Sequence, residues 1–140
     1  MDRLTLPNDI ETIPQLNEFI DGFCEQRDID NDITMSLNLA IEEAVVNVMN
    51  YAYPEGTRAT ILLEVFADEE SVRFVLCDDG KPFDPTASEE VDIENNVKNK
   101  IIGGMGIHLI RHYMDHIAYE RKDGQNILTM TKKIKDNQIK

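Results

Sequence analysis

The sequence is short of positive charge and of long apolar runs. It has 14 lysines and arginines against 27 aspartates and glutamates, a formal net charge of −13. This balance argues against a protein that binds the nucleic-acid phosphate backbone, because such binding needs clustered basic residues. It also argues against binding to an anionic membrane surface. No apolar stretch approaches the roughly 20 residues that span a bilayer, and no signal peptide is evident. We therefore expect a cytoplasmic protein with neither a nucleic-acid nor a membrane partner.

Cysteine is also scarce. The two cysteines, Cys24 and Cys77, show no CxxC spacing, so we expect two reduced thiols packed in a core. The remaining composition, 41% apolar and 29% charged over 140 residues, is ordinary for a globular protein. It predicts one domain over residues 1–140, long enough to bury a core.

Apolar periodicity predicts three helices. The first spans about 9–27, with Pro14 in its first turn, where proline is tolerated. The second begins near 30–32, where Asp and Asn side chains can cap free backbone amides, and stops at Pro54. The third spans about 106–115.

Alternating and apolar runs predict five strands. They cover about 3–6, 59–66, 72–77, 116–121 and 126–133. A polar segment, about 84–102, lacks clear periodicity and has the character of a functional lid, and we expect the tail 135–140 to be disordered. The order β-α-α-β-β-lid-α-β-β predicts an α+β fold, a mixed sheet with helices on one face.

The first of three candidate clusters lies on the second helix. Glu43, Asn47 and Asn50 have i, i+4, i+7 spacing, so they share a face turned away from the apolar stripe. A carboxylate and a carboxamide placed this way can activate a hydroxyl and ligate a hard cation through oxygen. A solvated helix face would show the same residues, and the adjacent carboxylate of Glu42 competes for the role of base.

The second cluster is Asp78-Asp79-Gly80, directly after an apolar strand. A carboxylate there can accept a hydrogen bond from an exocyclic amine, which distinguishes adenine from a purine with a carbonyl at that position. Gly80 would let the purine approach the backbone. An ordinary strand-ending turn has the same sequence.

The third cluster, Gly103-Gly104-Met105-Gly106, precedes the third helix. Glycines before a helix expose backbone amides at its positive end, which suits phosphates. It is neither a GxxxxGK[ST] loop nor a Rossmann GxGxxG, and a flexible hinge is the alternative.

Taken together, the three clusters resemble the GHKL ATP-binding superfamily, most closely its branch of anti-sigma factor serine kinases. The stretch 43–53 is similar to that branch's N box, 78–85 to its first glycine box and 103–110 to its second. Met114-Asp115 and Gly124-Gln125-Asn126 also fit, so the resemblance runs from about residue 3 to 133. It implies a two-layer Bergerat-type sandwich with a mixed, mostly antiparallel sheet and a mobile ATP lid.

The resemblance also implies roles for individual residues. Glu43 would be the general base and Asn47 the Mg²⁺ ligand, with Asn50 at the end of the same box. Asp78 would recognise the adenine amine, with Gly80 beneath the ring. The segment 103–106 would bind the phosphates of ATP, with Gly104 and Gly106 bringing the backbone to them. The branch often has His where this chain has Tyr51. The lid residues Lys98 and Lys100 could approach the γ-phosphate.

The function implied is transfer of the ATP γ-phosphoryl group to a serine of an anti-sigma antagonist with a STAS fold, by a homodimer that also binds a sigma factor in a partner switch. The alternative is a sequestering module with little kinase activity, although an intact Glu43 favours the enzyme. A nucleotide-sensing accessory domain is a third hypothesis, weakened because no phosphoacceptor-histidine helix pair is found.

His108, His112 and His116 share four-residue spacing; a metal site there is conceivable, but a polar helix face is the favoured interpretation.

Overall fold

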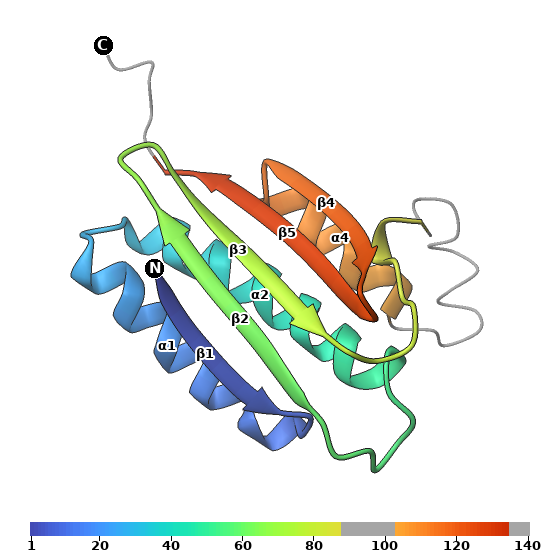
Figure 1. Cartoon of the computed structure of the whole chain (residues 1–140). Helices are drawn as coiled ribbons and strands as arrows, with labels where there is room; N and C mark the ends of the chain where they lie inside the picture. Colours follow the sequence, from blue (N-terminus) through green and yellow to red (C-terminus); the bar gives the residue numbers. More distant parts are fainter. Residues whose placement is uncertain (88–102, 135–140) are drawn as a thin grey trace.

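A computed structural model of the chain describes residues 1–87 and 103–134. Most of the expected lid, including Lys98 and Lys100, and the tail 135–140 therefore lie outside the described residues. Five strands form one sheet, and helices cover one of its faces (Figure 1). The strands are β1 (Asp2–Pro7), β2 (Thr60–Ala67), β3 (Ser71–Asp78), β4 (His116–Lys122) and β5 (Gln125–Lys133). The α-helices are α1 (Ile13–Gln26), α2 (Asn31–Tyr51) and α4 (Gly103–Tyr113), and the short 3-10 helices are η1 (Ile10–Thr12) and η2 (Pro85–Ala87).

The sheet has the strand order β1-β2-β3-β5-β4, with every one of these pairs antiparallel. The expected two-layer α+β fold is confirmed, and the pairing is more uniform than the mixed, mostly antiparallel sheet expected. The last strand of the chain lies next to β3, and β4 forms an edge. Pairing of β3 with β5 sets Asp78 directly opposite Asn126, which places two polar residues at the same end of the sheet.

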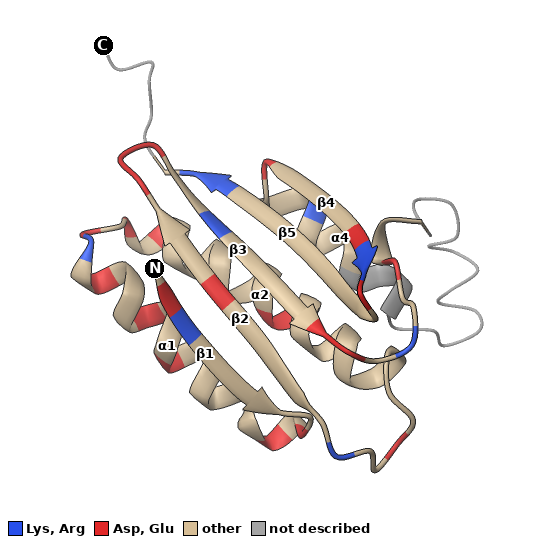
Figure 2. Cartoon of the chain, in the orientation of Figure 1, with Lys and Arg blue, Asp and Glu red and all other residues tan. Residues whose placement is uncertain are grey.

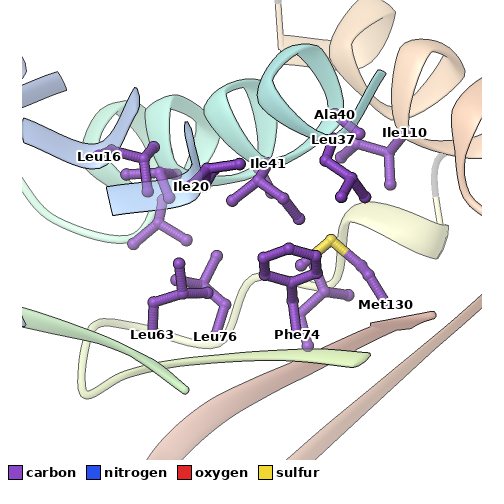
Figure 3. Close-up of a cluster of buried hydrophobic side chains, with 14 of the residues drawn as sticks. Leu16, Ile20, Leu37, Ala40, Ile41, Leu63, Phe74, Leu76, Ile110 and Met130 are labelled. Atoms are coloured by element: carbon purple, nitrogen blue, oxygen red, sulfur yellow. The ribbon is translucent and has the colours of Figure 1, made fainter. Parts of the chain in front are cut away.

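The core lies between the sheet and the helices. Helix residues at three- and four-residue steps meet alternate residues of the central strands, as the sequence predicts (Figure 3). Leu37 and Ile41 of α2 point toward Phe74 and Leu76 of β3 in this layer. Because β3 has buried residues at every second position, its inward face continues to Asp78 at its end.

Three local expectations need correction. The first helix opens with η1, so α1 begins only at Ile13, and its second residue is Pro14, as expected. Asp30 stands at the N-cap of α2, but its side chain makes no capping hydrogen bond; its backbone carbonyl instead accepts from the Thr34 amide and hydroxyl. Cys77 is half-buried and faces away from the helices, because it alternates with inward-facing neighbours on β3.

The third helix begins earlier than the sequence predicts. Gly103 is already helical, so the glycine-rich segment forms the first turn of α4 and does not precede it. The amides of a first helical turn have no partner within the helix. The backbone amides expected to bind phosphates therefore lie in the first turn of α4, where they still have no partner within the helix. Within the described residues, no helix combines the length and the apolar character needed to cross a membrane.

Candidate functional site

A small pocket lies between α2 and the end of the sheet where β3 terminates. Most of its walls are apolar, and three buried polar side chains converge in it, which is the usual composition of a small-molecule site. The lining residues come from α2, β3, the segment after β3, β4 and β5: Ala44, Asn47, Val48, Leu76, Asp78, Phe83, Pro85, Tyr119, Asn126 and Leu128.

Asp78 is the polar residue at the inner end of β3. Its side chain is only 3% exposed because it continues the inward-facing series of that strand. Burial raises the pKa of this carboxyl, while hydrogen bonds from Asn126 and Gly80 act in the opposite direction. Both of those bonds, 2.9 Å each, reach Oδ1. Oδ2 accepts no hydrogen bond from the residues described here, so it is free to accept one from a ligand in the pocket.

Gly80 lies two residues beyond, where the chain turns against the end of α2. A Cβ at this position would stand 2.3 Å from the carbonyl oxygen of Ala52 and 2.8 Å from its Cβ. The next amide, that of Lys81, donates to the same carbonyl over 2.8 Å. Packing against α2 thus requires a glycine here, and contact of Gly80 with a purine ring stays a prediction.

The α2 residues of the first cluster differ in burial. Asn47 lines the pocket and is 3% exposed, so it does not belong to a solvated helix face. Its Nδ2 is buried without a hydrogen-bond partner among the described residues. Glu43, one turn earlier, is half-buried and Asn50 is exposed, and neither of them lines the pocket. Burial, followed by the charge of Glu42, raises the pKa of Glu43.

An unpaired buried amide is costly, and proteins rarely keep one without a use for it. The carboxamide of Asn47, which lines the pocket, carries one acceptor oxygen and one N–H₂ donor group. Mg²⁺ in nucleotide sites is typically held by one or two protein oxygens together with substrate phosphates. Asn47 therefore fits the ligand role expected for it, with its second amide atom available to phosphate or water.

Asn126 is a pocket residue to which sequence reasoning assigns no role. It opens the buried series of β5 and is 4% exposed. Its carboxamide contacts Asp78, the segment after β3 and the edge strand β4. A signal for it is present in the sequence, because Gly124-Gln125-Asn126 fits the family pattern, but the partner of this asparagine depends on strand register.

The remaining expected residues lie elsewhere. Gly103, Gly104, Met105 and Gly106 form the N-terminal turn of α4, directly after the undescribed part of the chain. Of the three histidines, His116 opens β4 and so does not share the helix with the other two. No group of three His, Cys, Asp or Glu side chains that could hold a metal ion exists in residues 1–87 and 103–134.

The fold is shared with a solved structure. A solved structure of the RsbU and RsbW domains from Mycobacterium tuberculosis superimposes with a TM-score of 0.62 at 13% identity, over 94% of this chain and 32% of that one. At this identity the likeness establishes the fold alone, and the chain spans about a third of that structure.

The family follows from sequence. The model of the histidine kinase-like ATPase domain matches residues 6–132, so the chain belongs to this family. Serine/threonine-protein kinase BtrW of Bordetella bronchiseptica is 31% identical over 99 residues, 71% of this chain and 70% of that protein. Serine-protein kinase RsbW of Halalkalibacterium halodurans is 28% identical over 149 aligned positions, 98% of this chain and 90% of that protein. The family expected from the three clusters is confirmed, and the expected enzyme class is the one these relatives carry in their names.

Proposed function

We propose that the protein is an ATP-dependent kinase that phosphorylates a serine on a protein partner. The observation that carries the proposal is the presence of two buried polar groups in one apolar pocket. One is a carboxylate with one oxygen that accepts no hydrogen bond from the described residues, and the other is an amide whose N–H₂ group donates none to them. Asp78 supplies the first and Asn47 the second. These are the positions that the family resemblance assigns to adenine and to Mg²⁺.

The chemistry assigned to Glu43 is that of a general base. Its half-buried side chain lies one helical turn before Asn47, on the same side of α2. In the transfer, the serine oxygen forms a bond to the γ-phosphorus as the bond from that phosphorus to the β–γ bridging oxygen breaks. The hydroxyl proton passes to Glu43, and ADP leaves. Mg²⁺ bound through Asn47 would offset charge on the phosphates.

We further propose that the acceptor is a STAS-fold anti-sigma antagonist and that the kinase is a homodimer that also binds a sigma factor. The resemblance to anti-sigma factor kinases supports this assignment, and the relatives named as serine kinases support its kinase part. The acidic charge is compatible with a basic partner surface, as on a DNA-binding sigma domain (Figure 2). Phosphorylation of the antagonist would release the kinase for its other partner.

Labelling with γ-³²P-ATP tests the kinase activity directly. The protein is incubated with Mg-ATP and a STAS-fold antagonist, and phosphoserine is followed in three proteins: wild type, Glu43→Gln and Glu42→Gln. Glu42 is the matched control because it is the adjacent carboxylate, and glutamine keeps the oxygen that accepts from Asn17 at 3.3 Å. We expect labelling by wild type and by Glu42→Gln, and a loss on the order of 10²–10⁴-fold in Glu43→Gln.

A sequestering module is the second candidate. It predicts that wild type binds ATP and captures its partner but labels no serine, so that Glu43→Gln changes nothing. The adenine assignment is tested separately with Asp78→Asn, which we expect to weaken ATP binding strongly in isothermal titration calorimetry. Unchanged affinity in that variant would refute the assignment for either candidate.

A further inference from the structure

Asn126 is bound on both sides of its carboxamide. Its Nδ2 donates to Oδ1 of Asp78 over 2.9 Å and to the carbonyl oxygen of Lys81 over 2.9 Å. Its Oδ1 accepts from the backbone amide of Phe83 over 3.1 Å. One asparagine thus connects the end of β3 with both sides of the turn that follows it.

Two side chains from the edge strand β4 complete the arrangement. The hydroxyl of Tyr119 donates to Oδ1 of Asn126 over 2.5 Å, and Nη1 of Arg121 donates to the same oxygen over 3.3 Å. The same nitrogen of Arg121 also donates to the carbonyl oxygen of Gly80 over 2.8 Å. Two acceptors therefore face the nitrogen of the carboxamide and three donors face its oxygen, so only one orientation satisfies all of them.

This fixed orientation decides which atom of Asp78 meets a ligand. Oδ1 of Asp78 is held by two donors, the amide of Gly80 and Nδ2 of Asn126, while Oδ2 has no partner within the described residues. A carboxylate free to rotate would share its acceptors between the turn and the pocket. A carboxylate held at one oxygen presents the other as a pure acceptor, which suits an amine and repels a carbonyl.

We infer that Asn126 is a positioning residue for nucleotide-base selection, which sets the preference for a purine bearing an exocyclic amine over one bearing a carbonyl. The inference rests on the proposed function, in which Asp78 receives the base. Asn126 acts through Asp78 and need not touch the base itself. Tyr119 and Arg121 support the same orientation from β4.

Asn126 also stabilises the turn, so loss of stability alone would not separate a positioning role from a structural one. The ratio of the affinities for ATP and inosine triphosphate does separate them. Both nucleotides carry the same phosphates and ribose, and they differ at the purine position where adenine has an amine. Any reduction in the fraction of competent protein lowers both affinities equally and cancels in the ratio.

The experiment measures both dissociation constants by calorimetry for wild type, Asn126→Ala, Tyr119→Phe and Gln125→Ala. Removing one donor that holds a buried carboxylate should lower the preference of Asn126→Ala for ATP about 5- to 100-fold. Tyr119→Phe keeps the ring and the Nδ2 contacts, so we expect a smaller reduction, about 2- to 5-fold. Gln125 is the exposed neighbour on β5 and serves as the matched control, with an unchanged ratio.

A double variant tests whether Asn126 acts through Asp78. In the Asp78→Asn background, Asn126→Ala should change the ratio no further. The inference is overturned if Asn126→Ala and Tyr119→Phe both keep the wild-type ratio while Asp78→Asn loses it, and the proposed function then stands. If Asn126→Ala does not fold, the ratio in Tyr119→Phe decides the question. If Asp78→Asn itself keeps the wild-type affinity and ratio, the adenine assignment fails together with the inference.

Discussion

Replacing Gly80 by alanine tests how tightly the turn after β3 is packed on α2. The new Cβ would lie 2.3 Å from the carbonyl oxygen of Ala52 and 2.9 Å from its carbonyl carbon, and these backbone atoms cannot swing away as a long side chain could. The turn must therefore move, and the hydrogen bond from the Lys81 amide to the same carbonyl is lost with it. Overpacking costs about 1–3 kcal/mol and the lost hydrogen bond about 0.5–1.5 kcal/mol, so we expect destabilisation of about 1.5–4.5 kcal/mol.

Thermal unfolding measures this effect, with Gly22→Ala as the matched control. For a chain of this size the expected loss corresponds to a fall in Tm of about 5–15 °C. Gly22 lies within α1 with nothing within 4 Å of an added Cβ. The same substitution there should therefore stabilise the helix by about 0.5–1 kcal/mol. Nucleotide affinity should fall in Gly80→Ala, because the amide of Gly80 is one of the donors to Asp78, and stay unchanged in Gly22→Ala. A Gly80→Ala protein that melts with wild type and binds ATP equally well would refute the packing argument.

Two further predictions concern α2. A general base must be ionised, so activity should rise with pH through the pKa of Glu43; burial and the charge of Glu42 raise that pKa, so the rise should come above the usual range of a glutamate. Glu42→Gln removes the like charge and should move the rise to lower pH, and pH–rate profiles with an unmoved midpoint would contradict this cause. In urea unfolding, Leu37→Ala should cost about 2–5 kcal/mol because the side chain is fully buried against the sheet. Leu39→Ala, at 40% exposed, should stay within about 0.5 kcal/mol of wild type, and equal losses in the two variants would contradict the burial assignment.

Much of the fold could be predicted from sequence because burial in each element is periodic. The apolar stripe of α2 and the alternation along β3 identify their inner faces without knowledge of the neighbours. The start of α4 could not be predicted in this way, because glycines are poor helix formers and signal a turn. The helix nevertheless includes Gly103, which intrinsic preference alone would exclude.

The position of the last two strands was also open. A hairpin formed by β4 and β5 can join the sheet through either strand. Burial in the structure reflects which strand joined the sheet: β5 alternates buried and half-buried residues along most of its length, and β4 has none that are fully buried. The buried positions of β5 suit a strand inside the sheet, and the lack of buried positions on β4 suits an edge strand.

The residues of the candidate site also differ in whether the sequence could identify them. Glu43, Asn47 and Asp78 could be proposed from sequence because each lies at a recognisable place on its own helix or strand. The role of Asn126 could not, because it depends on the register that sets this residue opposite Asp78, 48 positions earlier in the chain. Local pattern gives the face on which a residue lies, and only pairing gives its partner.

Two hydrogen bonds join the turn after β3 to the segment that directly follows α2. The hydroxyl of Tyr53 donates to Oδ1 of Asp79 over 2.7 Å, and the amide of Asp79 donates to the oxygen of Tyr53 over 3.0 Å. Burial, followed by the hydrogen bond to Asp79, raises the pKa of the Tyr53 hydroxyl. The turn that holds Asp78 and the helix that carries Glu43 are thereby joined at a fixed point. In the proposed kinase, the nucleotide and Glu43 would have to be aligned to a fraction of an ångström, and these two hydrogen bonds would fix the turn after Asp78 relative to α2 before ATP binds.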